Sequence, residues 1–127
     1  MTAYRFRVKF APDSTSLWRD IVVGADRTIA EFQSAINPAV GLDQTHLWFI
    51  RNDEEYWDSE VNSEMARQLS LEQYDRICYL YDYGDEWRFY AILKDVLDDE
   101  PSDTEPAVVN TEGESIDQYG SSRERRF

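Results

Sequence analysis

The stretch Arg76–Val96 reads RICYLYDYGDEWRFYAILKDV. Two runs rich in aromatic and β-branched residues flank the polar loop Asp82–Glu86, a composition that favours two strands joined by a tight turn. We expect strands over residues 76–81 and 87–96, with Gly84 supplying a positive φ in the turn. The second half of the chain is therefore predicted to contain an antiparallel hairpin.

Outward from this hairpin, other segments carry strand patterns. Residues 4–10 alternate strictly between apolar and basic side chains, which predicts a half-buried strand. Residues 17–23 follow the turn-forming segment 11–16 and are predicted to form a hairpin with the first strand. Two shorter runs, 46–51 and 56–57, predict a third strand and the start of a return strand.

One segment carries the pattern of a helix. Thr28 is followed three residues later by Glu31, which is the capping-box spacing of a helix N-terminus. An apolar stripe at helical spacing comes next, made of Ile29, Phe32, Ala35 and Ile36. Pro38 and Gly41 are expected to end or break this helix.

The predicted element order, β-β-α-β-β-β, defines the fold class. We expect an α+β protein with a small mixed or antiparallel sheet and one packed helix, in a β-grasp-like arrangement. Residues 1–97 are predicted to form a single domain. Residues 98–127 hold nine acidic and three basic side chains, and they are predicted to form a partly disordered acidic tail with one short segment on the domain.

The charge composition restricts the partners. The chain of 127 residues carries 26 acidic and 13 basic residues, giving a net charge of −13. Only two of the basic residues are lysines, and this acidic, lysine-poor composition is halophile-like. Duplex nucleic acid is not an expected partner, because its affinity comes largely from basic side chains that neutralise phosphates.

Location and redox chemistry follow from what the sequence lacks. Cys78 is the single cysteine and lies in an apolar run, so we expect a buried free thiol without a redox role. The first ten residues lack the apolar region of a signal peptide, and no stretch has 18 consecutive apolar residues. A cytoplasmic location with no membrane contact is the resulting prediction.

The loop between the hairpin strands is the candidate functional site. It consists of Asp82, Tyr83, Gly84, Asp85, Glu86 and Trp87, with His46 as a candidate neighbour. Asp82 and Asp85 are candidate ligands of a divalent cation, or one carboxylate with a raised pKa could act as an acid or base. The competing interpretation is a structural turn whose aspartates accept backbone hydrogen bonds. No cofactor is predicted, and the metal ion stays an alternative.

Together these motifs resemble the plasmid-Ri ORF-three-like family, which also occurs as insertion-element passenger proteins labelled TnpR. The resemblance is carried by LWRDIVV from Leu17, FQSAINPAVGLDQTHLWF from Phe32, YDYGDEW from Tyr81, and a tail with Pro106, Glu112-Gly113 and Asp117–Gly120. The aromatic-aspartate string from Tyr81 is the most specific of the four. The resemblance covers roughly residues 4–120 and implies a β-grasp-like α+β domain, but no particular reaction.

The chain departs from this family pattern in its histidines. Members of the family that the chain resembles usually carry one histidine in the helix, a pair around the third strand, and one after the Asp-x-Trp motif. The corresponding positions here are Gln33, His46 with Trp48, and Phe89, so only His46 remains. A metal or catalytic site built from those histidines is therefore not expected.

Three functional hypotheses remain. The first is a non-enzymatic interaction module, linked to mobile-element or plasmid biology, whose exposed sheet edges pair with a protein partner or with a second copy. The second is a metal-dependent enzyme or accessory factor that uses the Asp82, Asp85 and Glu86 loop. The third is nucleic-acid binding through a basic stripe on one sheet face, made of Arg5, Arg7, Lys9 and Arg88.

Overall fold

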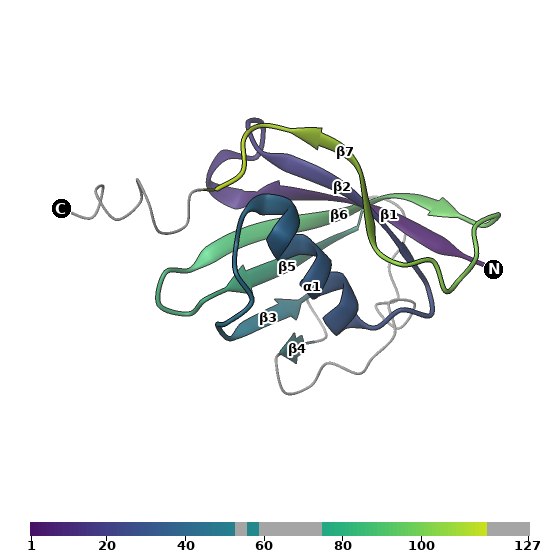
Figure 1. The fold of residues 1–127 in the computed structure, drawn as a ribbon, viewed down its shortest axis with the longest axis horizontal. Helices are drawn as coiled ribbons and strands as arrows, with labels where there is room; N and C mark the ends of the chain where they lie inside the picture. The colour runs from purple at the N-terminus through teal and green to yellow at the C-terminus, as the bar shows by residue number, and fades with distance from the viewer. Residues whose placement is uncertain (53–55, 59–74, 117–127) are drawn as a thin grey trace.

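The computed structural model describes residues 1–52, 56–58 and 75–116, which form one antiparallel sheet with a single α-helix across one face (Figure 1). The strands lie in the order β4-β3-β5-β6-β1-β2-β7. The elements are β1 (Ala3–Phe10), η1 (Ala11–Asp13), β2 (Trp18–Gly24), α1 (Ile29–Val40), β3 (Trp48–Arg51), β4 (Tyr56–Asp58), β5 (Arg76–Tyr81), β6 (Trp87–Leu97) and β7 (Ala107–Glu112). The α+β prediction with one packed helix is confirmed, whereas the β-grasp-like arrangement is not.

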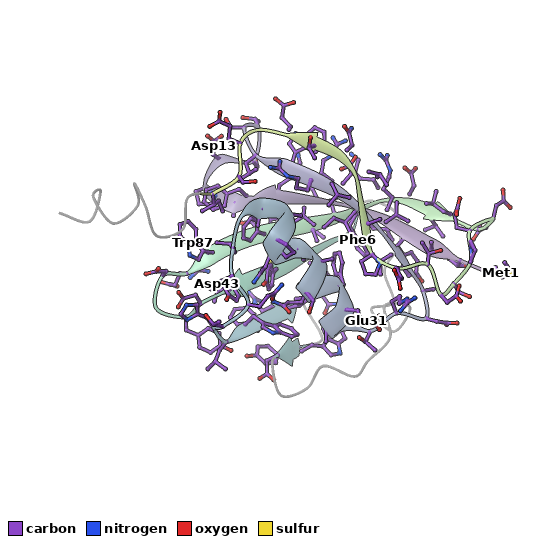
Figure 2. The ribbon with its side chains drawn as sticks, viewed as in Figure 1. Met1, Phe6, Asp13, Glu31, Asp43 and Trp87 are labelled. Atoms are coloured by element: carbon purple, nitrogen blue, oxygen red, sulfur yellow. The ribbon has the colours of Figure 1, made fainter. Side chains whose placement is uncertain are left out.

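The core lies between α1 and the sheet. The alternation in β1 turns Phe6 and Val8 inward, where both are fully buried. The Phe6 ring packs on Phe32 of α1 with 4.7 Å between centroids, and Figure 2 shows Phe6 beneath the helix. In the centre of the sheet Val8 pairs with Ala91 of β6, so the first strand is held by a strand that is distant from it in the sequence.

The helix begins as predicted and ends at Gly41, one of the two residues predicted to end or break it, where φ is 90°. The Thr28 hydroxyl accepts the Glu31 N–H, and the Glu31 carboxylate accepts the Thr28 N–H, which completes the capping box. Pro38 lies inside α1 rather than at its end, because the side-chain amide of Gln44 donates to the Ser34 carbonyl at 2.8 Å. In a regular helix the N–H of residue 38 would donate to the Ser34 carbonyl, but proline has no N–H, and the Gln44 amide takes its place. Among the described residues, no helix could cross a membrane.

The predicted boundary at residue 97 does not mark the end of the folded sheet. Residues 107–112 form β7, which pairs with β2 at the edge of the sheet. Backbone bonds also hold the residues before and after β7 on the helix side. The Asp26 N–H donates to the Ser102 carbonyl at 2.8 Å, and the Ile116 N–H donates to the Val40 carbonyl at 2.7 Å. β2 would otherwise leave a row of unpaired backbone groups, and β7 satisfies them. Residues 117–127, the rest of the predicted tail, lie outside the described residues.

Two consecutive residues of β2 place charges on opposite faces of the sheet. Arg19 is 5% exposed, on the helix side, and its guanidinium donates to main-chain carbonyls and to one serine hydroxyl. Asp20 is 0% exposed, on the other side, and accepts from Arg5 and Arg7 of β1. Because successive strand residues alternate between faces, one strand supplies a polar anchor to each side.

Candidate functional site

The predicted loop is a capped turn between β5 and β6. The Asp82 carboxylate accepts the backbone N–H groups of Gly84 at 3.1 Å and Asp85 at 3.4 Å. The positive φ angles belong to Asp82 (64°) and Glu86 (55°), so the prediction that Gly84 supplies the positive φ is wrong. Aspartate adopts this conformation because its short side chain can bond the local backbone.

The three carboxylates of the loop do not converge. Asp82 is used within the turn, and Glu86 accepts a hydrogen bond from the exposed Arg88. Trp87 leaves the loop on the core side and packs near Phe10, with 6.2 Å between ring centroids. Within residues 1–52, 56–58 and 75–116, no group of three or more His, Cys, Asp or Glu side chains is placed to hold a metal ion.

His46 does lie beside the loop, as predicted, and between two carboxylates. Its Nε2 is 3.8 Å from Asp82 and 3.8 Å from Asp43, an acidic residue that the sequence analysis did not single out. The Tyr81 hydroxyl donates to Asp43 and accepts the His46 backbone N–H at 3.0 Å. We call Asp43, His46, Tyr81 and Asp82 the His46 cluster; it joins the end of the α1–β3 loop to the end of β5.

A buried polar layer continues from this cluster beneath α1. Tyr79 is 1% exposed; its hydroxyl donates to Asn37 at 2.5 Å and accepts from Gln33 at 2.9 Å. Burial raises the pKa of Tyr79 above its ordinary value. Burial, followed by the hydrogen bond to Asp43, raises the pKa of Tyr81 to about 12. Both hydroxyls therefore stay protonated at neutral pH and act as structural donors.

Replacing Tyr81 tests this structural role through pH. Below pH 10 the Tyr81 proton is bound in both states, so Tyr81→Phe should lower the free energy of unfolding by about 1–2 kcal/mol through lost hydrogen bonds. Above pH 10 the unfolded chain loses this proton while the folded chain keeps it up to a pKa of about 12, so the wild-type advantage falls as pH rises. Urea unfolding at pH 7, 9 and 11 should show the two proteins converging. Parallel curves would contradict the raised pKa.

A shallow groove of about 390 Å³ lies between α1 and residues 105–106. Its one cation, Arg27, already donates to the Asp103 carbonyl at 2.6 Å and to Glu31 at 2.9 Å. These bonds fix the segment before β7 against the helix, so the groove has a structural explanation.

The sheet face opposite α1 carries the residues that sequence reasoning only partly found. The strand register places one side chain from each of six neighbouring strands in a transverse row on this face. From β4 to β2 the row is Tyr56, Arg51, Cys78, Tyr90, Lys9 and Trp18. We call this side of the sheet the open face, because no described helix covers it (Figure 1).

The cations of the open face fall into two groups. Arg5, Arg7 and Arg88 are neutralised, since Arg5 and Arg7 bond the buried Asp20, Arg5 also bonds Asp95, and Arg88 bonds Glu86. Lys9, Arg51 and Arg76 have no carboxylate partner in the part of the chain that the structure describes. The predicted basic stripe therefore lies on one face, but its unpaired charge sits on Lys9 and on two arginines that were not predicted. Their signal was the alternation within the third and fourth predicted strands.

The guanidinium groups on this face also lie over aromatic rings. The Arg7 Cζ is 3.8 Å from the centroid of the Trp18 ring, and the Arg76 Cζ is 4.4 Å from that of Tyr90. At the β4 edge the rings of Tyr56 and Phe49 stack at 5.4 Å. Such arrangements hold planar groups in fixed orientation near the surface.

These features define the class: an antiparallel α+β sheet with one covered face and one open face rich in aromatic and basic residues. The fold is similar to the crystal structure of the protein of unknown function MM3350 from Methanosarcina mazei Go1, with a TM-score of 0.70 and 17% identity over 98% of this chain and 78% of that chain. No curated protein matches the sequence. The family model of the plasmid pRiA4b ORF-3-like proteins matches residues 2–118. The chain therefore belongs to the plasmid pRiA4b ORF-3-like protein family, as the sequence resemblance predicts.

Proposed function

We propose that this protein is a non-enzymatic interaction module that binds its partner on the open face. The observation that carries this proposal is the row of three aromatic and two basic side chains on a face without a covering helix among the described residues. Aromatic rings and arginines are the side chains that contribute most to binding surfaces. The family to which the chain belongs supports a link with plasmid or mobile-element biology.

The His46 cluster favours a structural role over a catalytic one. The Tyr81 hydroxyl is occupied as both donor and acceptor, and the Asp82 carboxylate caps its own turn. His46 and Asp43 contribute to holding the α1–β3 loop against the end of β5. These contacts explain the cluster without a reaction.

Cys78 offers a direct test, because the only thiol of the chain stands in the middle of the row. A benzophenone attached to Cys78 should cross-link a bound partner when labelled protein is illuminated in cell extract. The identified species, once purified, should bind unlabelled protein, and Arg51→Glu should weaken that binding at least tenfold.

A matched control moves the thiol to the covered side of the molecule. Cys78→Ser combined with Ser34→Cys places the label on the exposed surface of α1, where no cross-link to the same species is expected. Equal cross-linking from both positions, or purified species that bind Arg51→Glu as well as wild type, would refute binding on the open face.

A further inference from the structure

We propose that the open face binds single-stranded nucleic acid, with bases stacked on its aromatic rings and on the arginines that lie over them, and with phosphates beside cations that have no carboxylate partner among the described residues. This inference rests on the proposed function and names the partner class for the same surface. Duplex nucleic acid is still not the expected partner, because reading a duplex requires a helix or strand that enters a groove, and a row of side chains across a sheet does not enter one.

The row of side chains on the open face fits a single strand in its geometry. Neighbouring strands lie about 4.8 Å apart, so the row from Tyr56 to Trp18 runs roughly 24 Å across the sheet. Along it aromatic and basic side chains alternate around a central thiol: Tyr56, Arg51, Cys78, Tyr90, Lys9 and Trp18. A single strand presents the same alternation of flat bases and anionic phosphates, and stacking platforms on sheets recognise it in this way.

Two arginines of the open face lie over aromatic rings. Arg7 lies over Trp18 and Arg76 lies over Tyr90, with 3.8 and 4.4 Å between the guanidinium carbon and the ring centroid. A guanidinium held in this way presents its outer surface to a base, since bases stack on arginine planes as well as on aromatic rings. Arg76 also brings positive charge that no carboxylate in the described part of the chain neutralises.

The balance of charge on the open face differs from that of the whole chain. Acidic residues outnumber basic ones 26 to 13 in the whole chain, whereas the described strand residues of the open face include six basic and four acidic ones. The basic residues are Arg5, Arg7, Lys9, Arg51, Arg76 and Arg88, and the acidic ones are Asp20, Asp58, Asp95 and Glu112. An acidic peptide would use these cations but would leave the aromatic rings of the row without a function. The combination therefore favours nucleic acid over an acidic protein segment.

Fluorescence anisotropy with a labelled 12-nucleotide oligothymidine in 50 mM salt tests the inference. The wild-type protein should bind the oligothymidine. Its affinity for a 12-base-pair duplex and for a 12-residue polyglutamate should be at least tenfold lower. Tyr56→Ala should weaken oligothymidine binding roughly five- to 150-fold, the range for losing one stacked base, and Tyr56→Phe should restore it. Tyr56 is 52% exposed, so these variants are expected to fold.

Charge variants separate local contacts from overall charge. Lys9→Gln with Arg51→Gln should weaken binding at least tenfold and reduce the slope of log K against log salt by about 1.4, for two lost phosphate contacts. Ser34→Glu with Thr45→Glu changes the net charge by the same amount at exposed positions away from the open face, and should bind within threefold of wild type. Circular dichroism confirms that each variant is folded.

Several results would overturn the inference: no binding of oligothymidine, equal binding of duplex or polyglutamate, or equal loss in the two charge variants. The cross-linking test distinguishes this failure from failure of the proposed function. If oligothymidine does not bind but Cys78 cross-links a protein that Arg51→Glu releases, the partner class is wrong and the interaction module stands. If neither binds, both are wrong.

Discussion

Asp20→Asn is expected to lower the free energy of unfolding by about 3 kcal/mol. The Asp20 carboxylate is fully buried and accepts three hydrogen bonds, at 3.0 Å from Arg5 and at 2.8 and 3.0 Å from Arg7. Asparagine retains one acceptor oxygen, but its NH₂ group would face a guanidinium, and the negative charge of the Asp20 carboxylate is lost. Arg7 would then lack its counter-charge and Arg5 would keep only the half-exposed Asp95, and breaking a buried pair in this way costs about 3–5 kcal/mol. Urea unfolding at high salt measures the difference.

Asp95→Asn provides the matched control for this variant. Asp95 also bonds Arg5, at 2.8 Å, but its side chain is 42% exposed. Exposed ion pairs contribute at most about 1 kcal/mol, so this variant should remain close to wild type. Equal destabilisation by the two substitutions would show that the buried position of Asp20 is not what makes its contacts strong.

Arg19→Met is expected to destabilise the protein by about 3 kcal/mol or more. The guanidinium donates at 2.7–3.0 Å to the carbonyls of Trp18, Ala39, Glu112 and Gly113, and at 3.4 Å to the Ser115 hydroxyl. Burial lowers the pKa of Arg19, and these oxygens compensate the buried charge. Methionine fills the space of the aliphatic stem but removes the donor from these part-buried carbonyls, and an unsatisfied carbonyl of this kind costs about 1–3 kcal/mol when water cannot replace the donor.

The local consequence of Arg19→Met should be visible beyond the stability measurement. Since the guanidinium joins the end of α1 to the residues that end β7, amide exchange in residues 107–116 should accelerate more than exchange in β5 and β6. Arg27→Met is the control, because Arg27 bonds a carbonyl at an exposed position and should change stability by no more than about 1 kcal/mol. Uniform acceleration across the sheet would contradict a local role for Arg19.

The sequence predicted those elements whose side chains divide between core and solvent. β1 shows this division in its alternation, and α1 shows it in the capping box and the apolar stripe. β7 escaped prediction because all six of its residues are exposed and its backbone alone joins it to β2. An edge strand of this kind has no period-two pattern, and its acidic surroundings resemble a disordered tail.

The turn between β5 and β6 lies where the sequence predicted it, but its geometry depends on contacts that sequence spacing does not reveal. His46 lies beside Asp82 because the α1–β3 loop reaches the end of β5, and Asp43 comes with it. The basic stripe depended on strand pairing in the same way, since Asp20 neutralises Arg5 and Arg7 from the neighbouring strand. Periodicity assigns a residue to a face, but it does not identify its neighbour across the sheet.

The strand order has a consequence for synthesis on the ribosome. β1 and β2 emerge first, yet in the finished sheet β1 pairs with β6 and β2 pairs with β7. The N-terminal hairpin must therefore remain without its final neighbours until residue 112 has left the exit tunnel. During that interval both of its edges are open to pairing with other chains, and such edges promote aggregation. A nascent chain of this protein is thus expected to need chaperone protection for most of its translation.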